Sequence, residues 1–178
     1  MKLLVVTPYL PYPPASGGQI RTFNLLKYLS KKNEITLVSL YKYEHERTFV
    51  SRLEPYCKKI YLCKRAERPW RLSLILKAVF SPKPFLVVRN YSDEAEEVLK
   101  KLLMTESFDV IHAETFYVMP HIPTTTIPIL LVEQTIEFKV YEHFISNLNI
   151  LLRAPLYLDI VKLKYWEKDY WEKASIVF

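Results

Sequence analysis

Cysteine is scarce in this sequence, with two residues among 178. Two cysteines cannot build a disulfide framework, and Cys57 and Cys63 lack the further partners that a zinc site needs. The default for such a chain is a reducing compartment. We therefore expect a cytoplasmic location and no structural metal.

Long apolar runs are also absent. No segment approaches the roughly 18 apolar residues of a membrane span, and the run Leu3–Val6 is far shorter than a signal-peptide core of about 7 to 15 residues. Hydrophobic residues nevertheless make up 50% of the chain, with charges of both signs interspersed. This composition and length exclude disorder over most of the chain and favour a single globular domain.

Glycine is limited to two residues, which excludes several phosphate-binding motifs. The sequence contains neither a G-x-G-x-x-G motif nor a Walker loop, and it has no D-x-D pair and no G-x-S-x-G elbow. Both glycines stand together as Gly17-Gly18, after a loop with four prolines and before a predicted helix. Their amides would suit an anion at a helix N-terminus, or the pair would form a tight turn with positive φ and Ser16 as helix cap.

Short apolar runs alternate with helical patterns, which is typical of a parallel sheet with helices on its faces. We therefore predict an α/β fold: a Rossmann-like parallel sheet flanked by helices, in a single domain. The predicted strands are Leu3–Thr7, Glu34–Leu40, Lys59–Leu62, Val110–Ala113 and Ile129–Glu133. The predicted helices are Gly18–Ser30, Glu44–Glu54, Leu72–Phe80, Ser92–Thr105, Glu137–Leu152 and Leu156–Lys173.

The C-terminal part holds two of these helices, separated at Arg153–Pro155, with Pro155 at a helix-starting position. The second has more apolar surface than one packing face needs, which indicates another partner. Ser175–Phe178 then looks like a strand cut off as it begins. We expect the chain to be one half of a larger protein.

Positive charge is concentrated between Lys58 and Lys83, a stretch with eight basic residues and one acidic residue. The rest of the chain has 17 basic and 18 acidic residues, a net charge of −1. The same stretch carries an apolar helical stripe, Leu72 to Phe80. The stripe packs on the core beneath a basic solvated face, or it lies in an anionic membrane interface. The candidates for membrane contact are Arg65, Arg68, Trp70, Arg71 and Lys77.

Several segments in order resemble the N-terminal domain of group 1 (family 4) GT-B glycosyltransferases. They are Met1–Pro11, Gly17–Arg21, Asn33–Val38, Phe108–Ala113, Ile129–Glu137 with Tyr141, and Tyr165–Val177. The resemblance implies that residues 1–178 form the acceptor-side domain of a GT-B fold, and that the C-terminal nucleotide-sugar-binding domain is absent from this chain. It also implies retention of the anomeric configuration.

The resemblance assigns roles to particular residues. Gly17 and Gly18 would face the donor diphosphate with their amides, and His112 would contact the acceptor hydroxyl, unless it is merely a hydrogen-bonded histidine at a strand end. Many family members have a second histidine where this chain has Glu114, so either His112 or Glu114 would be the base. The acceptor-binding candidates are Thr7, Arg21, Glu133 and Glu137.

The partners follow from the same reading. A nucleotide-sugar is a substrate shared with the missing domain, the acceptor offers a hydroxyl, and no cofactor or metal is expected. The basic stretch would place the domain on the inner face of an anionic membrane, and surface left by the missing domain would favour a homodimer. The alternative is a non-enzymatic basic binding module for RNA or a protein, although no RNA-binding signature is present and no nucleic acid is expected.

Overall fold

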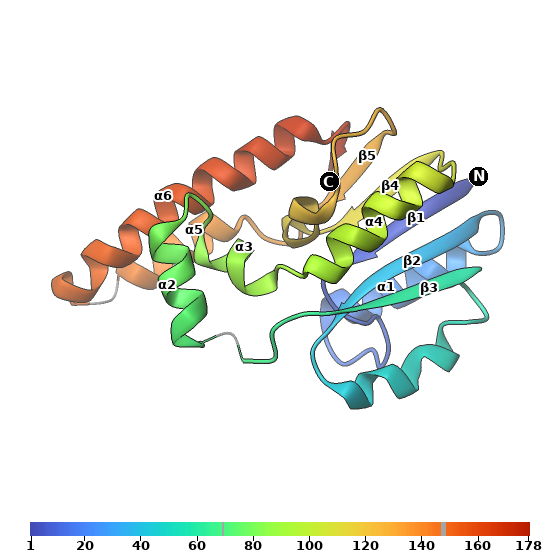
Figure 1. Cartoon of the computed structure of the whole chain (residues 1–178), viewed down its shortest axis with the longest axis horizontal. Helices are drawn as coiled ribbons and strands as arrows, with labels where there is room; N and C mark the ends of the chain where they lie inside the picture. The colour runs from blue at the N-terminus through green and yellow to red at the C-terminus, as the bar shows by residue number, and fades with distance from the viewer. Residues whose placement is uncertain (69, 147–148) are drawn as a thin grey trace.

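The chain folds around one twisted sheet, shown in Figure 1 as a computed structural model that describes residues 1–68, 70–146 and 149–178. The elements in chain order are β1 (Lys2–Thr7), α1 (Gly17–Leu29), β2 (Glu34–Tyr41), the 3-10 helix η1 (Glu44–Arg52), β3 (Lys59–Lys64), α2 (Leu72–Phe80), α3 (Phe85–Asn90), α4 (Asp93–Thr105), β4 (Val110–Glu114), the 3-10 helix η2 (Phe116–His121), β5 (Ile129–Val132), α5 (Glu137–Ser146), α6 (Ile150–Lys173) and β6 (Ile176–Val177).

The sheet has six strands in the order β3-β2-β1-β4-β5-β6, and every pairing is parallel. This is the order of doubly wound dinucleotide-binding folds, and it reverses between β1 and β4. The predicted Rossmann-like α/β fold is confirmed. So is the last strand, because Ile176 and Val177 pair with Leu130 and Leu131 of β5.

Helices cover both faces of the sheet and create two apolar cores. One core joins the sheet to α3, α4, α5 and α6, and the other joins it to α1 and η1. In Figure 1, α4 crosses in front of the strands and α1 lies behind them. Alternation along each strand divides its side chains between the cores, as in β1, where Leu4 and Val6 enter one and Leu3 and Val5 the other. A strand buried on both faces needs such a continuous apolar run.

Helix boundaries follow capping residues. The Ser16 hydroxyl accepts a hydrogen bond from the Gln19 amide at the start of α1, at 3.3 Å. Ser92 does the same for Ala95 at the start of α4, again at 3.3 Å, and Asp93 and Glu94 follow in its positive first turn.

Side chains of α6 hold α2 and α3 beside the sheet. The Lys162 ammonium donates to the carbonyls of Ala78 at 2.9 Å and Ser81 at 2.8 Å, at the negative end of α2. The Asp159 carboxylate accepts from the Phe85 amide at 2.9 Å, at the positive end of α3. Opposite charges therefore face opposite helix ends, which stabilises the contact.

Two expectations need correction, and one helix was not expected. The segment from Glu44 is a 3-10 helix and not a regular α-helix. The two C-terminal helices do not separate at Arg153–Pro155, because α5 ends at Ser146 and α6 is already helical from Ile150. The sequence also gave no reason to expect α3, whose six apolar-rich residues are too short for a helical period.

The apolar stripe of α2 does not pack on the core, so that interpretation is wrong. Ala78 is the only buried residue that the structure gives this helix, whereas Leu72 is 70% and Phe80 is 85% exposed. The reason is its position: α2 packs beside α3, away from the sheet, and this contact covers a narrow side of the helix. The stripe is left on the surface.

Candidate functional site

Four polar side chains meet where β4 ends, on the face of the sheet that α1 covers. The Glu114 carboxylate is fully buried, at 0% exposure, and Arg21 from α1 donates to both of its oxygens, with Nη1 2.9 Å from Oε2. The Thr22 hydroxyl lies 3.1 Å from Oε1, and His112 Nε2 lies 3.1 Å from Oε2. His112 and Glu114 therefore point to the same side of β4, as their two-residue spacing predicts.

The charge of Glu114 is balanced by its neighbours. Burial by itself raises the pKa of Glu114, but the hydrogen bond and charge of His112, the charge of Arg21 and the Thr22 hydroxyl outweigh it, so the pKa lies below the ordinary value. Glu114 is therefore an ionised carboxylate at neutral pH, held in a buried position by three donors.

The geometry gives His112 and Glu114 different capacities. His112 is 8% exposed and Glu114 is not exposed at all. When Glu114 accepts a hydrogen bond from Nε2–H, the neutral imidazole keeps Nδ1 free of a proton, and such a nitrogen can accept a proton from a hydroxyl group. Glu114 then positions the imidazole while its own oxygens stay occupied.

The backbone directly after this pair is strained. Thr115 has φ 68° and ψ 158°, a region that residues other than glycine rarely adopt, and its hydroxyl is buried without a hydrogen-bond partner among the described residues. The neighbours hold it there: its amide donates to the Val132 carbonyl at 2.8 Å. Backbone strain of this kind is concentrated at functional sites.

Gly17 and Gly18 open α1 near this cluster. Neither glycine has positive φ, so the explanation by a tight turn is wrong, whereas the Ser16 cap is confirmed. A Cβ on Gly18 would lie 2.4 Å from the Tyr9 hydroxyl and 2.9 Å from Gln134 Oε1, two side chains that hydrogen-bond to each other at 3.2 Å. A Cβ on Gly17 would meet nothing within 4 Å. The helix N-terminus is thus open at Gly17 and covered at Gly18.

The acceptor-binding candidates fall into two groups. Thr7 lies with the cluster on the α1 side of the sheet: it is buried and donates to the Ser39 hydroxyl at 2.9 Å. Glu133 instead directly follows β5 and accepts from Trp171 of α6, which packs against the other core. Glu137 begins α5, where the Glu167 carboxylate accepts from the Glu137 amide at 2.8 Å. The structure therefore separates Thr7 and Arg21 from the two glutamates.

Glu133 is the most perturbed carboxyl of the second group. Burial, together with the nearby charge of Glu167, raises the pKa of Glu133 to about 8, although the Trp171 indole donates to it at 3.4 Å. Glu133 is thus largely protonated at neutral pH.

Some residues of these groups were not expected from the sequence. Thr22 and Ser39 gave no signal, since threonine and serine in a helix and a strand are common. Glu167 did give one: it is a charged residue inside the apolar stripe of Leu163, Trp166 and Tyr170, which indicates a buried group with a specific partner. That partner is the start of α5.

The five candidates for membrane contact do not all lie together. Arg68, Trp70, Arg71 and Lys77 are exposed before or within α2, and Trp70 is 71% exposed. Arg65 differs: it is only partly exposed, and its guanidinium donates to the Asn90 side chain of α3.

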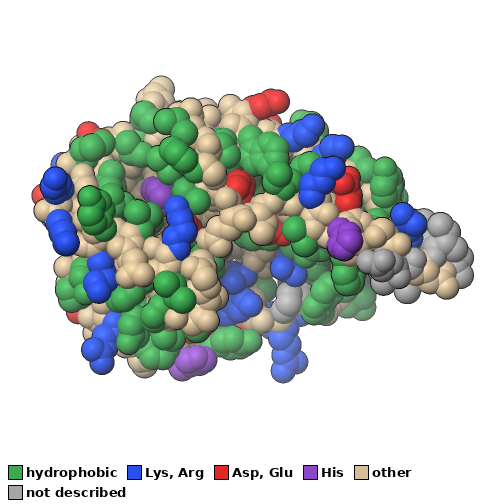
Figure 2. All heavy atoms as spheres, turned by 180° about the vertical axis from the view of Figure 1, so that it is seen from behind, with side chains coloured by type: hydrophobic (Ala, Val, Ile, Leu, Met, Phe, Trp, Pro, Cys, Tyr) green, Lys and Arg blue, Asp and Glu red, His purple; other side chains and the backbone are tan. Residues whose placement is uncertain are grey.

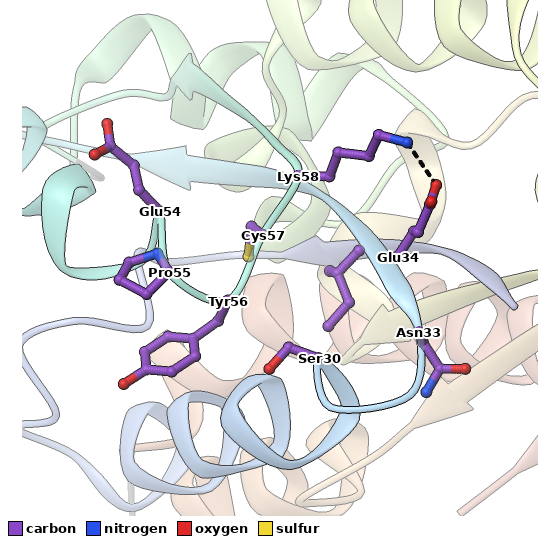
Figure 3. Close-up of a pocket in the computed structure, with 9 residues that line it drawn as sticks. Ser30, Asn33, Glu34, Glu54, Pro55, Tyr56, Cys57 and Lys58 are labelled. Carbon is purple, nitrogen blue, oxygen red and sulfur yellow. Dashed lines mark hydrogen bonds and ion pairs between the residues drawn. The ribbon is translucent and has the colours of Figure 1, made fainter.

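A pocket of about 280 Å³ lies away from all of these groups. Figure 3 shows it between the end of α1, the start of β2 and the turn before β3, where Lys58 pairs with Glu34. This is the amino edge of the sheet, whereas folds of this class bind ligands at the carboxyl edge. We therefore assign no function to it.

Two further findings concern metal binding and membrane-spanning helices. Among residues 1–68, 70–146 and 149–178, no three histidine, cysteine or acidic side chains are grouped so that they could hold a metal ion. No helix within the described part of the chain is both long and apolar enough to cross a membrane.

Comparison with known proteins gives one distant relative. The chain is 25% identical to an "Uncharacterized 44.6 kDa protein in cps region" of Klebsiella pneumoniae, over 94% of this chain. The match covers 42% of that protein, so the chain spans less than half of its relative's length. No family model matches the chain. No solved structure matches it.

Proposed function

We propose that this chain is the acceptor-binding half of a glycosyltransferase, which moves a sugar from a nucleotide-sugar to a hydroxyl acceptor. The observation that carries the proposal is the His112–Glu114–Arg21 cluster at the carboxyl edge of the sheet. It lies at the end of β4, next to β1, where the strand order reverses and where folds of this class bind ligands.

His112 is the residue that meets the acceptor in this proposal. Its imidazole accepts the proton of the acceptor hydroxyl or hydrogen-bonds to it, and Glu114 positions the ring. The role of base therefore falls to His112, the more accessible of the two.

The donor diphosphate lies at the start of α1 in this proposal. The open position at Gly17 lets backbone amides approach phosphate oxygens at the positive end of a helix. Amides placed there ease the charge that develops on the departing diphosphate. In this proposal the second half of the cleft is a separate nucleotide-sugar-binding domain, so we expect the 178 residues by themselves to be inactive.

The gene region of the distant relative is compatible with this proposal. Its cps region is a capsule gene region, which is a weak link to glycan biosynthesis and names no activity. A glycan-building step is compatible with that setting and with a Rossmann-like sheet.

The test is sugar transfer by the full-length gene product, with a panel of nucleotide-sugars and a lipid extract as acceptor source. We expect His112→Ala to abolish transfer and Glu114→Gln to reduce it, with the fold intact by circular dichroism. His143→Ala is the matched control, because His143 is an exposed histidine of α5 outside the cluster. Transfer that is indifferent to His112→Ala would overturn the proposal in favour of a non-enzymatic binding module.

Contact with an anionic membrane is the second part of this proposal. Trp70, Leu72, Val79 and Phe80 are 61% to 85% exposed, and the cations Arg71 and Lys77 flank them. An exposed apolar stripe with basic neighbours suits the interface of an anionic bilayer, because the apolar side chains insert while the cations bind headgroups.

Liposome sedimentation tests the membrane contact. Changing Arg68, Arg71 and Lys77 to Glu should abolish sedimentation with anionic vesicles. The control carries the same charge change at Lys31, Lys32 and Lys100, which are exposed on other helices or loops. Equal sedimentation of the two triple variants would exclude α2 as the docking surface. Binding of RNA in place of vesicles, with a steep salt dependence, would favour the binding module.

A further inference from the structure

Three cationic side chains come together at the carboxyl edge of the sheet, outside the His112–Glu114 cluster. Lys42 directly follows β2 and Arg65 directly follows β3, and these strands pair in register up to Tyr41 and Lys64. The Arg65 amide donates to the Tyr41 carbonyl at 2.9 Å, which keeps the two chain segments side by side. Arg89 comes from α3, which the bond between Arg65 and Asn90 ties to the same place.

The charges of these three residues act on one another. Burial, followed by the charges of Arg65 and Arg89, lowers the pKa of Lys42. Burial and the charge of Arg89 lower the pKa of Arg65 to about 10. Three like charges in a partly buried place repel one another, so this arrangement costs free energy unless an anion is present.

The protein itself supplies little compensating charge. Among the described residues, none of the three cations forms an ion pair with a carboxylate. Glu46 is the acidic residue whose charge reaches both Lys42 and Arg65, but its carboxylate accepts from the Lys42 and Tyr43 amides at 3.1 and 2.8 Å. Both amides bond to the same oxygen, so Glu46 caps the start of η1 and offsets at most one of the three positive charges.

Arg65 also has a donor without a partner. Its Nε is buried and makes no hydrogen bond among the described residues. A buried donor that stays unsatisfied is unfavourable, so an acceptor atom of a ligand would stabilise this place. Figure 2 shows several Lys and Arg side chains around the middle of the face that it presents.

We infer that Lys42, Arg65 and Arg89 bind a phosphate group carried by the acceptor. The oxygens of a phosphate accept from guanidinium and ammonium donors, and its charge offsets the mutual repulsion of the three cations. β2 and β3 lie two and three strands from β4, or roughly 10 to 14 Å. In this inference the acceptor extends from its phosphate along the carboxyl edge of the sheet toward the end of β4.

This inference rests on the proposed function for the identity of the ligand as acceptor, but the binding site can be tested without transfer. The probes are hexyl phosphate for an acceptor phosphate and UDP for a donor diphosphate, titrated calorimetrically into the purified full-length gene product. We expect Lys42→Met and Arg89→Gln each to weaken hexyl phosphate binding by about tenfold, which is the factor that one charge-assisted hydrogen bond contributes. UDP binding should change by less than about twofold, within the error of additivity.

The control variant is Lys100→Met with Lys101→Gln, which removes exposed cations from α4 and should leave both titrations unchanged. The melting temperature, measured with and without hexyl phosphate, distinguishes phosphate binding by Lys42 from a purely structural role of Lys42. Without phosphate, Lys42→Met should raise the melting temperature, because a like charge is removed. With saturating hexyl phosphate, the wild type should gain more than the variant.

Three results would overturn the inference: no hexyl phosphate binding by the wild type, equal binding by all variants, or loss of UDP binding alone, which would assign the cations to the donor. Hexyl phosphate binding that depends on Lys42 and Arg89 supports the site even if the full-length protein transfers no sugar, so the two proposals fail separately.

Discussion

Arg21 and Glu114 form a pair whose two members differ in burial, and this asymmetry predicts unequal effects of removing either one. The Arg21 side chain is 43% exposed and Glu114 is 0% exposed. Arg21→Met leaves a buried carboxylate with one donor fewer, whereas Glu114→Gln leaves a guanidinium that can turn into water. We therefore expect Arg21→Met to destabilise the fold more than Glu114→Gln.

The magnitude follows from the contacts that are lost. Breaking a fully buried pair from one side costs about 3 to 5 kcal/mol. Here His112 and Thr22 still bond to the carboxylate, and Arg21 is half in solvent, so the cost falls to about 1 to 3 kcal/mol for Arg21→Met. Glu114→Gln should cost less than about 1 kcal/mol, because a neutral amide fills the same space and part of the hydrogen bonding survives.

Urea unfolding at neutral pH measures both variants and their double mutant. A loss of 2 kcal/mol corresponds to a fall of roughly 4 to 8 °C in melting temperature for a domain of this size. The double mutant should be more stable than Arg21→Met alone, because it removes the unpaired anion. Equal losses in the two single variants, or a double mutant with additive losses, would refute the idea that the buried charge of Glu114 sets the cost.

Three other outcomes can be measured on the same chain. Lys162→Met should increase amide hydrogen exchange across Leu72–Phe80 and leave the exchange of α4 unchanged, because Lys162 bonds to two carbonyls at the end of α2. Unchanged exchange in α2 would contradict that role. Glu133→Gln should raise the unfolding free energy at pH 8 and change it little at pH 4. Because the pKa of native Glu133 is raised to about 8, the wild-type protein loses stability as the pH rises from 4.5 toward 8, by about 1.4 kcal/mol for each unit of pKa difference. A variant whose stability follows the same pH profile as wild type would contradict this role of Glu133. Gly18→Ala should displace the Tyr9 hydroxyl, visible as a changed tyrosine signal in NMR spectra, whereas Gly17→Ala should leave it in place.

The sheet was predictable from the sequence because a strand that is buried on both faces must be apolar without a break. Leu3 to Val6 and Ile129 to Val132 satisfy this rule, so local composition and tertiary role agree. The side of α2 that would be buried could not be predicted, because an apolar stripe is the same whether it faces a core or a surface. Only the position of α2 beside α3 decides the question.

The candidate site was predictable in part for a similar reason. The two-residue spacing of His112 and Glu114 places both on one side of β4, and that is a local property of a strand. The contact of Glu114 with Arg21 joins residues 93 positions apart, and no spacing reveals it. The cations Lys42 and Arg89 come from a strand end and a short helix, so their meeting with Arg65 depends on the register of β2 with β3 and on the placement of α3.

α6 connects the two surfaces for which partners are proposed. Lys162 fixes the end of α2, which carries the exposed stripe, and Asp159 fixes the start of α3, which carries Arg89. These two residues lie three positions apart, on adjacent turns of one helix, so they share a face of α6. The stripe and the cations are therefore held in a fixed relation by a single helix. A molecule that resides in a membrane and carries a phosphate would meet both features when it approaches this end of the sheet. If α6 sets that relation, Asp159→Asn should weaken hexyl phosphate binding through Arg89 and leave vesicle binding through α2 intact, and Lys162→Met should do the reverse.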